Sequence, residues 1–126
     1  MTDANTFPHP ILITGGAGFL GSHMVALCLE KQVDVMVIDN LSNSDLSNLQ
    51  KLESHFNITI PFYEIDIRDQ DKLKEFFNEH QFSAVIHFAG LKSVSESVAN
   101  PNLYHDNNVT GSQNVIDCIK AQGIKN

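Results

Sequence analysis

Positive charge and long apolar runs are both scarce in this chain of 126 residues. Eight Lys and Arg residues stand against fifteen Asp and Glu residues, which gives a net charge of −7, and the cations form no basic stripe. We therefore expect neither nucleic acid nor an anionic membrane as a partner, because both are recognised through clustered positive charge. No apolar run approaches the ~20 residues of a membrane span, and residues 1–10 lack the pattern of a signal peptide. A cytoplasmic protein is expected.

Cysteine and metal chemistry have little support. Cys28 and Cys118 fall in separate helical patterns, so we interpret them as reduced core thiols rather than as a disulfide or a nucleophile. The six histidines never fall at ligand spacing from cysteines or carboxylates, which makes a metal site unexpected. Repeats and low-complexity segments are missing too, and the length accommodates one domain at most. We divide the chain into a lead-in, residues 1–10, and a domain, residues 11–126.

The most informative stretch is residues 11–21, where a short apolar run breaks into closely spaced glycines. Gly15, Gly18 and Gly21 lie three residues apart, a spacing typical of dinucleotide-binding turns. The first glycine permits a tight turn, the second lets the backbone approach a pyrophosphate, and the third lets the following helix pack closely on the strand. The helix that opens at Phe19 then directs its positive end at that pyrophosphate.

The context of the glycines favours a ligand turn over an ordinary one. An apolar strand precedes them and a helical stripe follows, and residues 33–38 then form a second strand that ends on Asp39. An acidic residue at the carboxyl end of a second strand, eighteen positions after Gly21, is where such folds hold an adenosine ribose. Gln32 stands where a glycine commonly ends the first helix, so the exit of that helix is less certain than its start.

The rest of the chain continues the alternation of strands and helices. Leucines at helical spacing predict a second helix that Asn57 closes, and Asp69 is expected to cap a third. The further elements expected are a third strand at 58–65, a fourth strand at 84–88 and a long helix from Asn100 to Gly123. With right-handed crossovers, this order predicts an α/β fold, a partial doubly wound (Rossmann) parallel sheet of strand order 3-2-1-4 with helices on both faces.

Several loops at strand ends are candidate ligand contacts. Asp66 follows the third strand, at the sheet edge where ligands collect in open α/β folds. Residues 40–44 fit a ligand loop or a simple turn equally well, and Lys92 with Gly90 fits a phosphate contact or a solvated surface. We interpret His87, which lies inside a strand, as a core residue rather than a base.

Three residues have unfavourable helix propensity inside the predicted long helix. Asn107 and Asn108 have low helix propensity, and Gly111 costs about 1 kcal/mol relative to alanine. Locally unfavourable residues that cluster in one stretch indicate contact with something else.

Together these segments resemble the UDP-glucose 4-epimerases, a family of extended short-chain dehydrogenase/reductases. The likeness covers residues 11–126, and its glycine turn is shared across the superfamily. More specific are the His-Phe-Ala-Gly-Leu-Lys block at 87–92, the Glu-Ser-Val at 96–98 and the Asp-Asn-Asn-Val run at 106–109. The segments that carry the resemblance are residues 14–23, 37–44, 62–69, 85–92 and 104–111.

The resemblance implies NAD as the cofactor and assigns contacts to it by position. The pyrophosphate would lie along Gly15, Gly18, Phe19, Leu20 and Gly21. The adenosine ribose would be held by Asp39, Asn40 and Leu41, with Asn43 and Ser44 nearby. The adenine would lie between Asp66 and Ile67. The nicotinamide half would be lined by Phe88, Ala89, Gly90, Lys92 and Asn107. An acid at position 39 favours NAD over NADP because it would repel a 2′-phosphate.

The resemblance also shows what these 126 residues do not contain. A Tyr-x-x-x-Lys motif, a serine-rich stretch and a domain for the UDP-sugar would follow in the family, and Ser93, Ser95 and the missing glycine near position 32 are mild departures. In the family the tyrosine removes the proton of the sugar's 4-hydroxyl while hydride passes from C4 to NAD, and the keto sugar then takes hydride back on its other face. We expect this chain to be inactive alone.

Two other functions stay open. One is another nucleotide-sugar enzyme of the extended class, such as a dehydratase or decarboxylase, although the block at 87–92 argues against it. The other is a dinucleotide-binding module without catalysis. Because the fourth strand lacks further strands beside it, we also expect self-association, as a homodimer or edge to edge, through that strand and the last helix.

Overall fold

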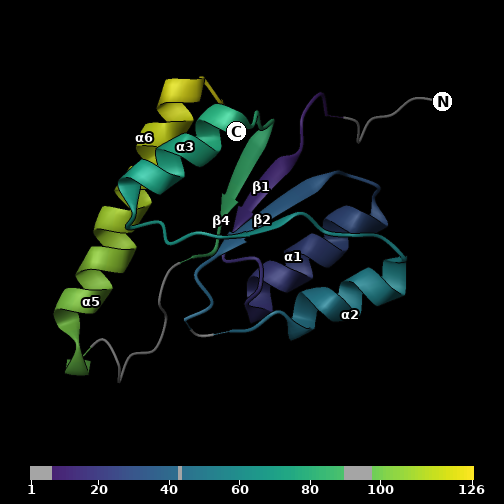
Figure 1. Ribbon diagram of the computed structural model, residues 1–126, viewed down its shortest axis with the longest axis horizontal. Helices are drawn as coiled ribbons and strands as arrows, with labels where there is room; N and C mark the ends of the chain where they lie inside the picture. The colour runs from purple at the N-terminus through teal and green to yellow at the C-terminus, as the bar shows by residue number, and fades with distance from the viewer. Residues whose placement is uncertain (1–6, 43, 90–97) are drawn as a thin grey trace.

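Strands and helices alternate along almost the whole chain (Figure 1). The computed structural model describes residues 7–42, 44–89 and 98–126. Its elements are β1 (Ile11–Thr14), α1 (Phe19–Glu30), β2 (Val35–Asp39), α2 (Ser47–Phe56), β3 (Phe62–Glu64), α3 (Gln70–Glu79), β4 (Ala84–His87), α5 (Pro101–His105), the π-helix η1 (Asp106–Gly111) and α6 (Ser112–Gln122). Among the described residues, no helix is long and apolar enough to cross a bilayer.

The four strands form one parallel sheet in the order β3-β2-β1-β4. Ile11 of β1 pairs with Val35 on one side and with Ala84 on the other, and Val37 pairs with Phe62. The predicted fold class and strand order are therefore confirmed. In a parallel sheet of this kind all carboxyl ends meet at one edge, which is where the glycine turn leaves β1.

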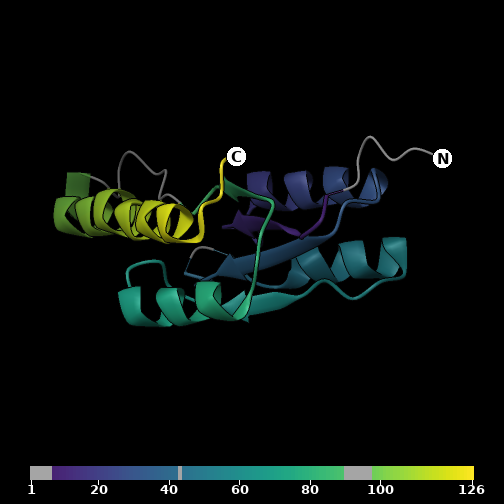
Figure 2. The same cartoon turned by 90° about the horizontal axis from the view of Figure 1, so that it is seen from above.

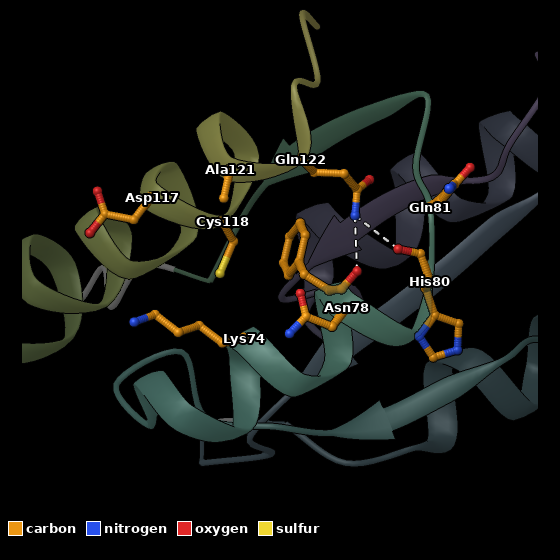
Figure 3. A pocket seen from close by; sticks show the side chains of 9 residues that line it. Lys74, Asn78, His80, Gln81, Asp117, Cys118, Ala121 and Gln122 are labelled. Atoms are coloured by element: carbon orange, nitrogen blue, oxygen red, sulfur yellow. Dashed lines mark hydrogen bonds between the residues drawn. The ribbon is translucent and has the colours of Figure 1, made fainter.

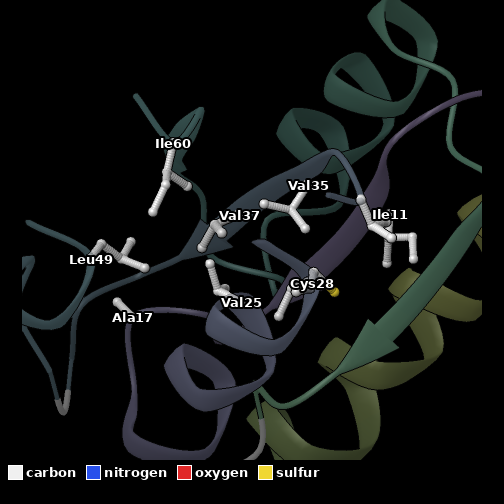
Figure 4. Close-up of a cluster of buried hydrophobic side chains, with 10 residues drawn as sticks. Ile11, Ala17, Val25, Cys28, Val35, Val37, Leu49 and Ile60 are labelled. Atoms are coloured by element: carbon white, nitrogen blue, oxygen red, sulfur yellow. The ribbon is translucent and has the colours of Figure 1, made fainter. Parts of the chain in front are cut away.

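Helices cover both faces of the sheet because its residues alternate in direction (Figure 2). Ile11 and Ile13 pack with residues of α1 and α2, in a cluster that also holds Val25 and Leu49 (Figure 4). Leu12 belongs to the opposite cluster, which α3 and α6 complete. Both Cys28 and Cys118 are buried and free, one in each cluster, as the sequence predicts.

The third strand is shorter than predicted, because it runs over Phe62–Glu64 rather than 58–65. Pro61 has no N–H for the ladder, although its carbonyl accepts from Val37 N at 2.9 Å. The N–H of Ile60 donates to the Glu53 carboxylate at 2.8 Å instead of to a strand. The strand therefore begins only after the proline.

The helix ends follow the sequence closely. Gln32 adopts a left-handed conformation, with φ of 59°, at the position where a glycine was missing. Asn57 ends α2 in the same conformation, and Asp69 caps α3 by accepting from Lys72 N. Asn100 lies at the N-cap of α5, but its side chain makes no capping hydrogen bond.

The predicted long helix is continuous but changes its winding. The π-helix η1 lies between α5 and α6 and contains the three residues that the sequence marks as costly, Asn107, Asn108 and Gly111. Short π segments inside α-helices occur frequently at functional sites. This segment passes close to the carboxyl edge of the sheet, as its contacts described below demonstrate.

Strand β4 ends one residue before the predicted boundary and forms one edge of the sheet. His87 is exposed there, so its interpretation as a core residue is wrong. Its ring nevertheless has hydrogen-bonding partners, Thr14 Oγ1 at 2.6 Å and Ser112 Oγ at 2.9 Å. The N–H of Val85 donates to the carbonyl of Asn126 at 3.1 Å, so the last residue covers part of this edge.

Candidate cofactor-binding site

Two glycines of the turn after β1 are required by the protein's own packing. Gly15 has φ of 71°, and a Cβ there would lie 2.6 Å from the carbonyl carbon of Phe88. A Cβ on Gly21 would collide with the carbonyl oxygen of Gly15 and lie 2.7 Å from Gly16 Cα. The first glycine therefore makes the turn beside β4, and the third lets α1 pack against it, as the spacing predicts.

Gly18 differs from both, because the described protein leaves room beside it. The nearest atom to a Cβ at this position is the carbonyl oxygen of Gly15, at 3.5 Å, an ordinary contact. Packing among the described residues therefore gives no reason for a glycine here. A backbone that must approach a ligand closely does give one, and the empty side of Gly18 fits a pyrophosphate.

The first residues of α1 are open to solvent. Phe19 is 72% exposed and Leu20 is 50% exposed. Gly18 is the N-cap and provides no side chain to accept from the first amides of the helix. The positive end of α1 is therefore available to an anion beside the glycine turn.

Asp39, at the end of β2, joins the turn to the next loop. Its carboxylate accepts from Ala17 N at 3.1 Å and from Leu41 N at 2.9 Å. Leu41 has φ of 59°, a conformation uncommon for a residue with a branched side chain and found more often at ligand sites. These contacts place a half-buried carboxylate directly beside the glycines.

Asn40 and Asp66 extend this arrangement toward β3. Asn40 Nδ2 donates to Asp66 Oδ2 at 3.3 Å, and Asn40 Oδ1 accepts from Ser42 N at 3.0 Å. Asp66 also receives a forked ion pair from Arg68, with the shortest contact at 2.6 Å. The hydrogen bonds from the Arg68 guanidinium are the largest cause of the lowered Asp66 pKa, about 2, so this carboxylate is ionised at neutral pH.

Ile67 is buried at 3% exposure and packs against the π-helix. A Cβ on Gly111 would lie 2.7 Å from Ile67 Cδ1, so the glycine allows the helix to approach. Asn114 Nδ2 donates to the carbonyl of Ile67 at 2.9 Å. The side chain of Ile67 therefore faces the protein interior, so only the backbone at this position could contact an adenine.

The residues after β4 lie at the other end of the sheet's carboxyl edge, away from β3. Phe88 N donates to the carbonyl of Thr14 at 2.8 Å, which holds the chain beside the glycine turn. Asn107, buried in η1, donates through Nδ2 to the carbonyl of Ala89 at 2.9 Å. The structure thus brings Phe88, Ala89 and Asn107 together at this edge, and their role as cofactor contacts stays a prediction.

Most predicted site residues accordingly gather along one edge of the sheet. Ser44 is half-buried in the loop after β2, and its predicted role stays a prediction. Asn43, Gly90 and Lys92 lie outside the described residues, so their predicted roles stay predictions.

Sequence reasoning missed Thr14, Ala17 and Arg68. The hydroxyl of Thr14 is buried between Phe88 N and the His87 ring, and Ala17 contributes its N–H to Asp39. Arg68 lies two residues after Asp66, and such a spacing permits both a backbone and a side-chain bond to the aspartate. The Asp-x-Arg spacing could therefore have predicted that Arg68 contacts Asp66.

Two pockets lie away from this edge. One, of about 380 Å³, opens between α3 and α6 beside Phe77, Cys118 and Gln122 (Figure 3). The other, of about 260 Å³, lies by the amino ends of β1 and β2. Neither is lined by a predicted cofactor contact. Over the described part of the chain, no three His, Cys, Asp or Glu side chains group as metal ligands would.

Known sequences that resemble this chain are nucleotide-sugar enzymes. The profile of the GDP-mannose 4,6 dehydratase family matches residues 12–126. A UDP-glucose 4-epimerase of Neisseria meningitidis serogroup B is 51% identical over 114 residues, which is 90% of this chain and 34% of that protein. A Klebsiella pneumoniae UDP-glucose 4-epimerase sequence is 43% identical over 116 residues, covering 92% of this chain and 84% of that sequence.

Solved structures agree with the sequences. The UDP-glucose 4-epimerase of Bifidobacterium longum, in complex with NAD+ and UDP, superposes with a TM-score of 0.87 at 38% identity, over 92% of this chain and 35% of that one. The Stenotrophomonas maltophila enzyme, with bound NAD and formylated UDP-arabinopyranose, gives a TM-score of 0.86 at 35% identity, over 93% of this chain and 35% of that one. This chain therefore spans about a third of the length of the Neisseria protein and of these two solved chains. It belongs to the UDP-glucose 4-epimerase family.

Proposed function

We propose that this chain binds NAD along the carboxyl edge of its sheet. The observation that carries the proposal is the contrast among the three glycines. Packing explains Gly15 and Gly21, whereas the side of Gly18 is open and faces no described protein atom closer than 3.5 Å. A phosphate-bearing ligand that needs close backbone approach explains that remaining glycine. The bound NAD of the related structures supports the same choice.

The described residues divide the proposed site into four parts. The turn and the open start of α1 would bind the pyrophosphate, and Asp39 with Asn40 and Leu41 would bind the adenosine ribose. Asp66 and the Ile67 backbone would border the adenine. The nicotinamide half would extend past Phe88, Ala89 and Asn107. We also retain Asn43, Ser44, Gly90 and Lys92 as proposed contacts.

We further propose that the whole protein interconverts UDP-glucose and UDP-galactose, with a UDP-sugar as its substrate. When bound, NAD supplies reversible hydride acceptance at C4 of the sugar. These 126 residues contain no Tyr-x-x-x-Lys to remove the hydroxyl proton, so the residues described here bind and orient but do not complete the chemistry. Residues 11–126 would then be the NAD-binding part, with the sugar-binding part elsewhere.

Two other functions compete with this one. The matched profile carries the name of a GDP-mannose 4,6 dehydratase, which keeps another nucleotide-sugar enzyme as the second candidate. A binding module without catalysis is the third candidate. Assay of the whole protein with UDP-glucose and with GDP-mannose would separate the two enzymes, and turnover of neither would favour the module.

Calorimetric titration with NAD tests the cofactor proposal directly. We expect the wild-type chain to bind, and Gly18→Ala to lose most of its affinity while keeping its melting temperature, because the protein itself tolerates a Cβ there. Gly21→Ala is the contrasting variant, because its Cβ collides with the turn and should lower the melting temperature. Unchanged affinity in a folded Gly18→Ala variant would contradict a pyrophosphate at this glycine.

We also propose self-association through β4 and the last helix, in a cytoplasmic setting. Three of the four β4 residues are half-buried at the edge of the sheet, and Ile116 of α6 is 42% exposed. Free buried thiols are usual in a reducing compartment. Size-exclusion chromatography with light scattering should find a dimer or larger species, and a monomer at high concentration would count against it.

A further inference from the structure

Arg68 connects two parts of the proposed site that are far apart in sequence. Its guanidinium forms a fork on the Asp66 carboxylate, with Nε at 3.0 Å from Oδ1 and Nη2 at 2.6 Å from Oδ2. Its Nη1 lies 3.7 Å from Oδ2 of Asp106, the first residue of the π-helix. One side chain thus links the β3–α3 loop to the helix that contains Asn107.

This linkage leaves Asp66 little freedom. Both carboxylate oxygens accept from Arg68, and Asn40 donates to Oδ2 from the neighbouring loop. The same fork is the main cause of the low Asp66 pKa, about 2, with smaller contributions from other hydrogen bonds. Forked arginine–carboxylate pairs fix orientation as well as charge, since the planar guanidinium matches two oxygens at once.

Further contacts hold the loop and the helix together. Gly111 allows the π-helix to lie against Ile67, and Asn114 donates to the carbonyls of Ile67 and Arg68 at 2.9 and 3.4 Å. These contacts hold the loop after Asp66 without the Arg68 side chain. What Arg68 adds is the orientation of the Asp66 side chain and compensation for negative charge.

Charge compensation matters at this edge. Arg68 contacts two carboxylates, Asp66 and Asp106. A third, Asp39, lies next in sequence to Asn40, whose side chain donates to Asp66. A ligand with a pyrophosphate brings further negative charge to the same edge. A fixed counter-charge lowers the repulsion that such a ligand meets.

We propose that Arg68 is a positioning residue for the adenine half of the bound dinucleotide. It orients the Asp66 carboxylate toward that half and offsets its charge, and through Asp106 it joins this end of the site to the π-helix. This role rests on the proposed NAD-binding function.

The test is calorimetric titration of NAD and of AMP into the wild-type chain and into Arg68→Gln, Arg68→Lys and Lys72→Gln. Arg68→Gln should weaken both ligands by the same factor, about tenfold, because the lost interaction belongs to the adenine half. Arg68→Lys keeps the charge without the fork and should recover only part of the affinity. Lys72→Gln removes an equal charge one turn away, where Lys72 Nζ contacts the carbonyl of Glu64 rather than Asp66, and should change little.

A double-mutant cycle with Asp66→Asn shows whether Arg68 acts through Asp66. In the Asp66→Asn background, Arg68→Gln should have almost no further effect on NAD affinity. Additive losses, equal losses in Lys72→Gln, or an unchanged affinity in Arg68→Gln would overturn the role. If Arg68→Gln fails to fold, Arg68→Lys and Asp106→Asn carry the test, with smaller losses expected and unchanged affinity in both overturning it. A folded wild-type chain that binds no NAD would instead overturn the proposed function itself.

Discussion

The side-chain amide of Asn107 donates a 2.9 Å hydrogen bond to the main-chain oxygen of Ala89. Asn107 is only 3% exposed, and its amide also donates to Asn108 Oδ1 at 3.1 Å. The π-helix is thereby tied to the loop that leaves β4. A residue unfavourable for helix propensity thus serves a contact between elements, which is what its position in the sequence suggests.

Asn107→Asp should destabilise the chain by roughly 3 kcal/mol, because a buried carboxylate would face two oxygen acceptors in place of a donor. Urea denaturation at pH 7 measures the change in the free energy of unfolding. The same substitution at Asn102, which is exposed on α5, is the matched control and should have a small effect. Equal effects at both positions would show that the Ala89 contact contributes nothing to stability.

Gly111→Ala should also destabilise the chain, although alanine normally improves a helix interior by about 1 kcal/mol over glycine. The new Cβ would lie 2.7 Å from both Cδ1 and Cγ1 of Ile67, and overpacking of this kind costs about 1–3 kcal/mol. Thr110→Ala, at the exposed neighbouring position, controls for helix propensity.

A double variant separates steric conflict from other effects of Gly111→Ala. Ile67→Ala removes the two clashing carbons, so Gly111→Ala should be neutral or stabilising in that background. Chemical denaturation of the four chains gives the coupling energy. A Gly111→Ala single variant as stable as the wild type would mean that the helix has room to move away from the β3–α3 loop.

The sequence predicts much of this fold because local signals agree with each other. Glycine spacing, the position of Asp39 and the alternation of elements all depend on neighbours within a few residues or on one crossover. The π winding of residues 106–111 escapes prediction, since it differs from an α-helix by one residue in a turn. Likewise, β3 is short because the N–H of Ile60 donates to the Glu53 carboxylate rather than to a strand. The alternation of apolar and polar residues does not predict that hydrogen bond.

The contacts that complete the site are harder to predict, because they join residues distant in sequence. Thr14 and His87 are hydrogen-bonded although they lie 73 residues apart in sequence, and Asn114 donates to the carbonyl of Ile67, 47 residues away. Polar residues at these positions look like ordinary surface or helix residues until the sheet order brings them together. Among the missed residues, only Arg68 has a partner close in sequence, because it follows Asp66 by two residues.

Gln122 should be important for stability despite its place at the end of the last helix. Its Nε2 donates to the carbonyls of Phe77 and His80 at 2.9 and 2.8 Å (Figure 3). Its Oε1 accepts from Phe82 N at 2.9 Å. Gln122→Met would remove the hydrogen bonds that Gln122 makes to these groups and should cost about 2–4 kcal/mol.

Urea denaturation measures that loss, with Gln113→Met as its control. Gln113 lies exposed in the same helix and donates to the exposed Asp117 carboxylate at 2.8 Å, so its replacement should cost under about 0.5 kcal/mol. Similar losses for the two variants would point to a general effect of methionine in α6 rather than to the end of α3.

The ion pair of Asp66 and Arg68 predicts how the free energy of unfolding depends on pH in acid. Its pKa is lowered from the ordinary 3.8 to about 2, chiefly by the hydrogen bonds from Arg68. Because the folded pKa is the lower one, the unfolded chain binds more protons between these two values, and the stabilisation present above pH 4 is lost as the pH falls toward 2. Arg68→Gln removes the cause of the shift, so its free energy of unfolding should fall less steeply over that interval. Urea denaturation at half-unit pH steps compares the slopes, with Lys72→Gln as the charge control. Parallel slopes in the wild type and Arg68→Gln would show that Asp66 owes its low pKa to something other than this arginine.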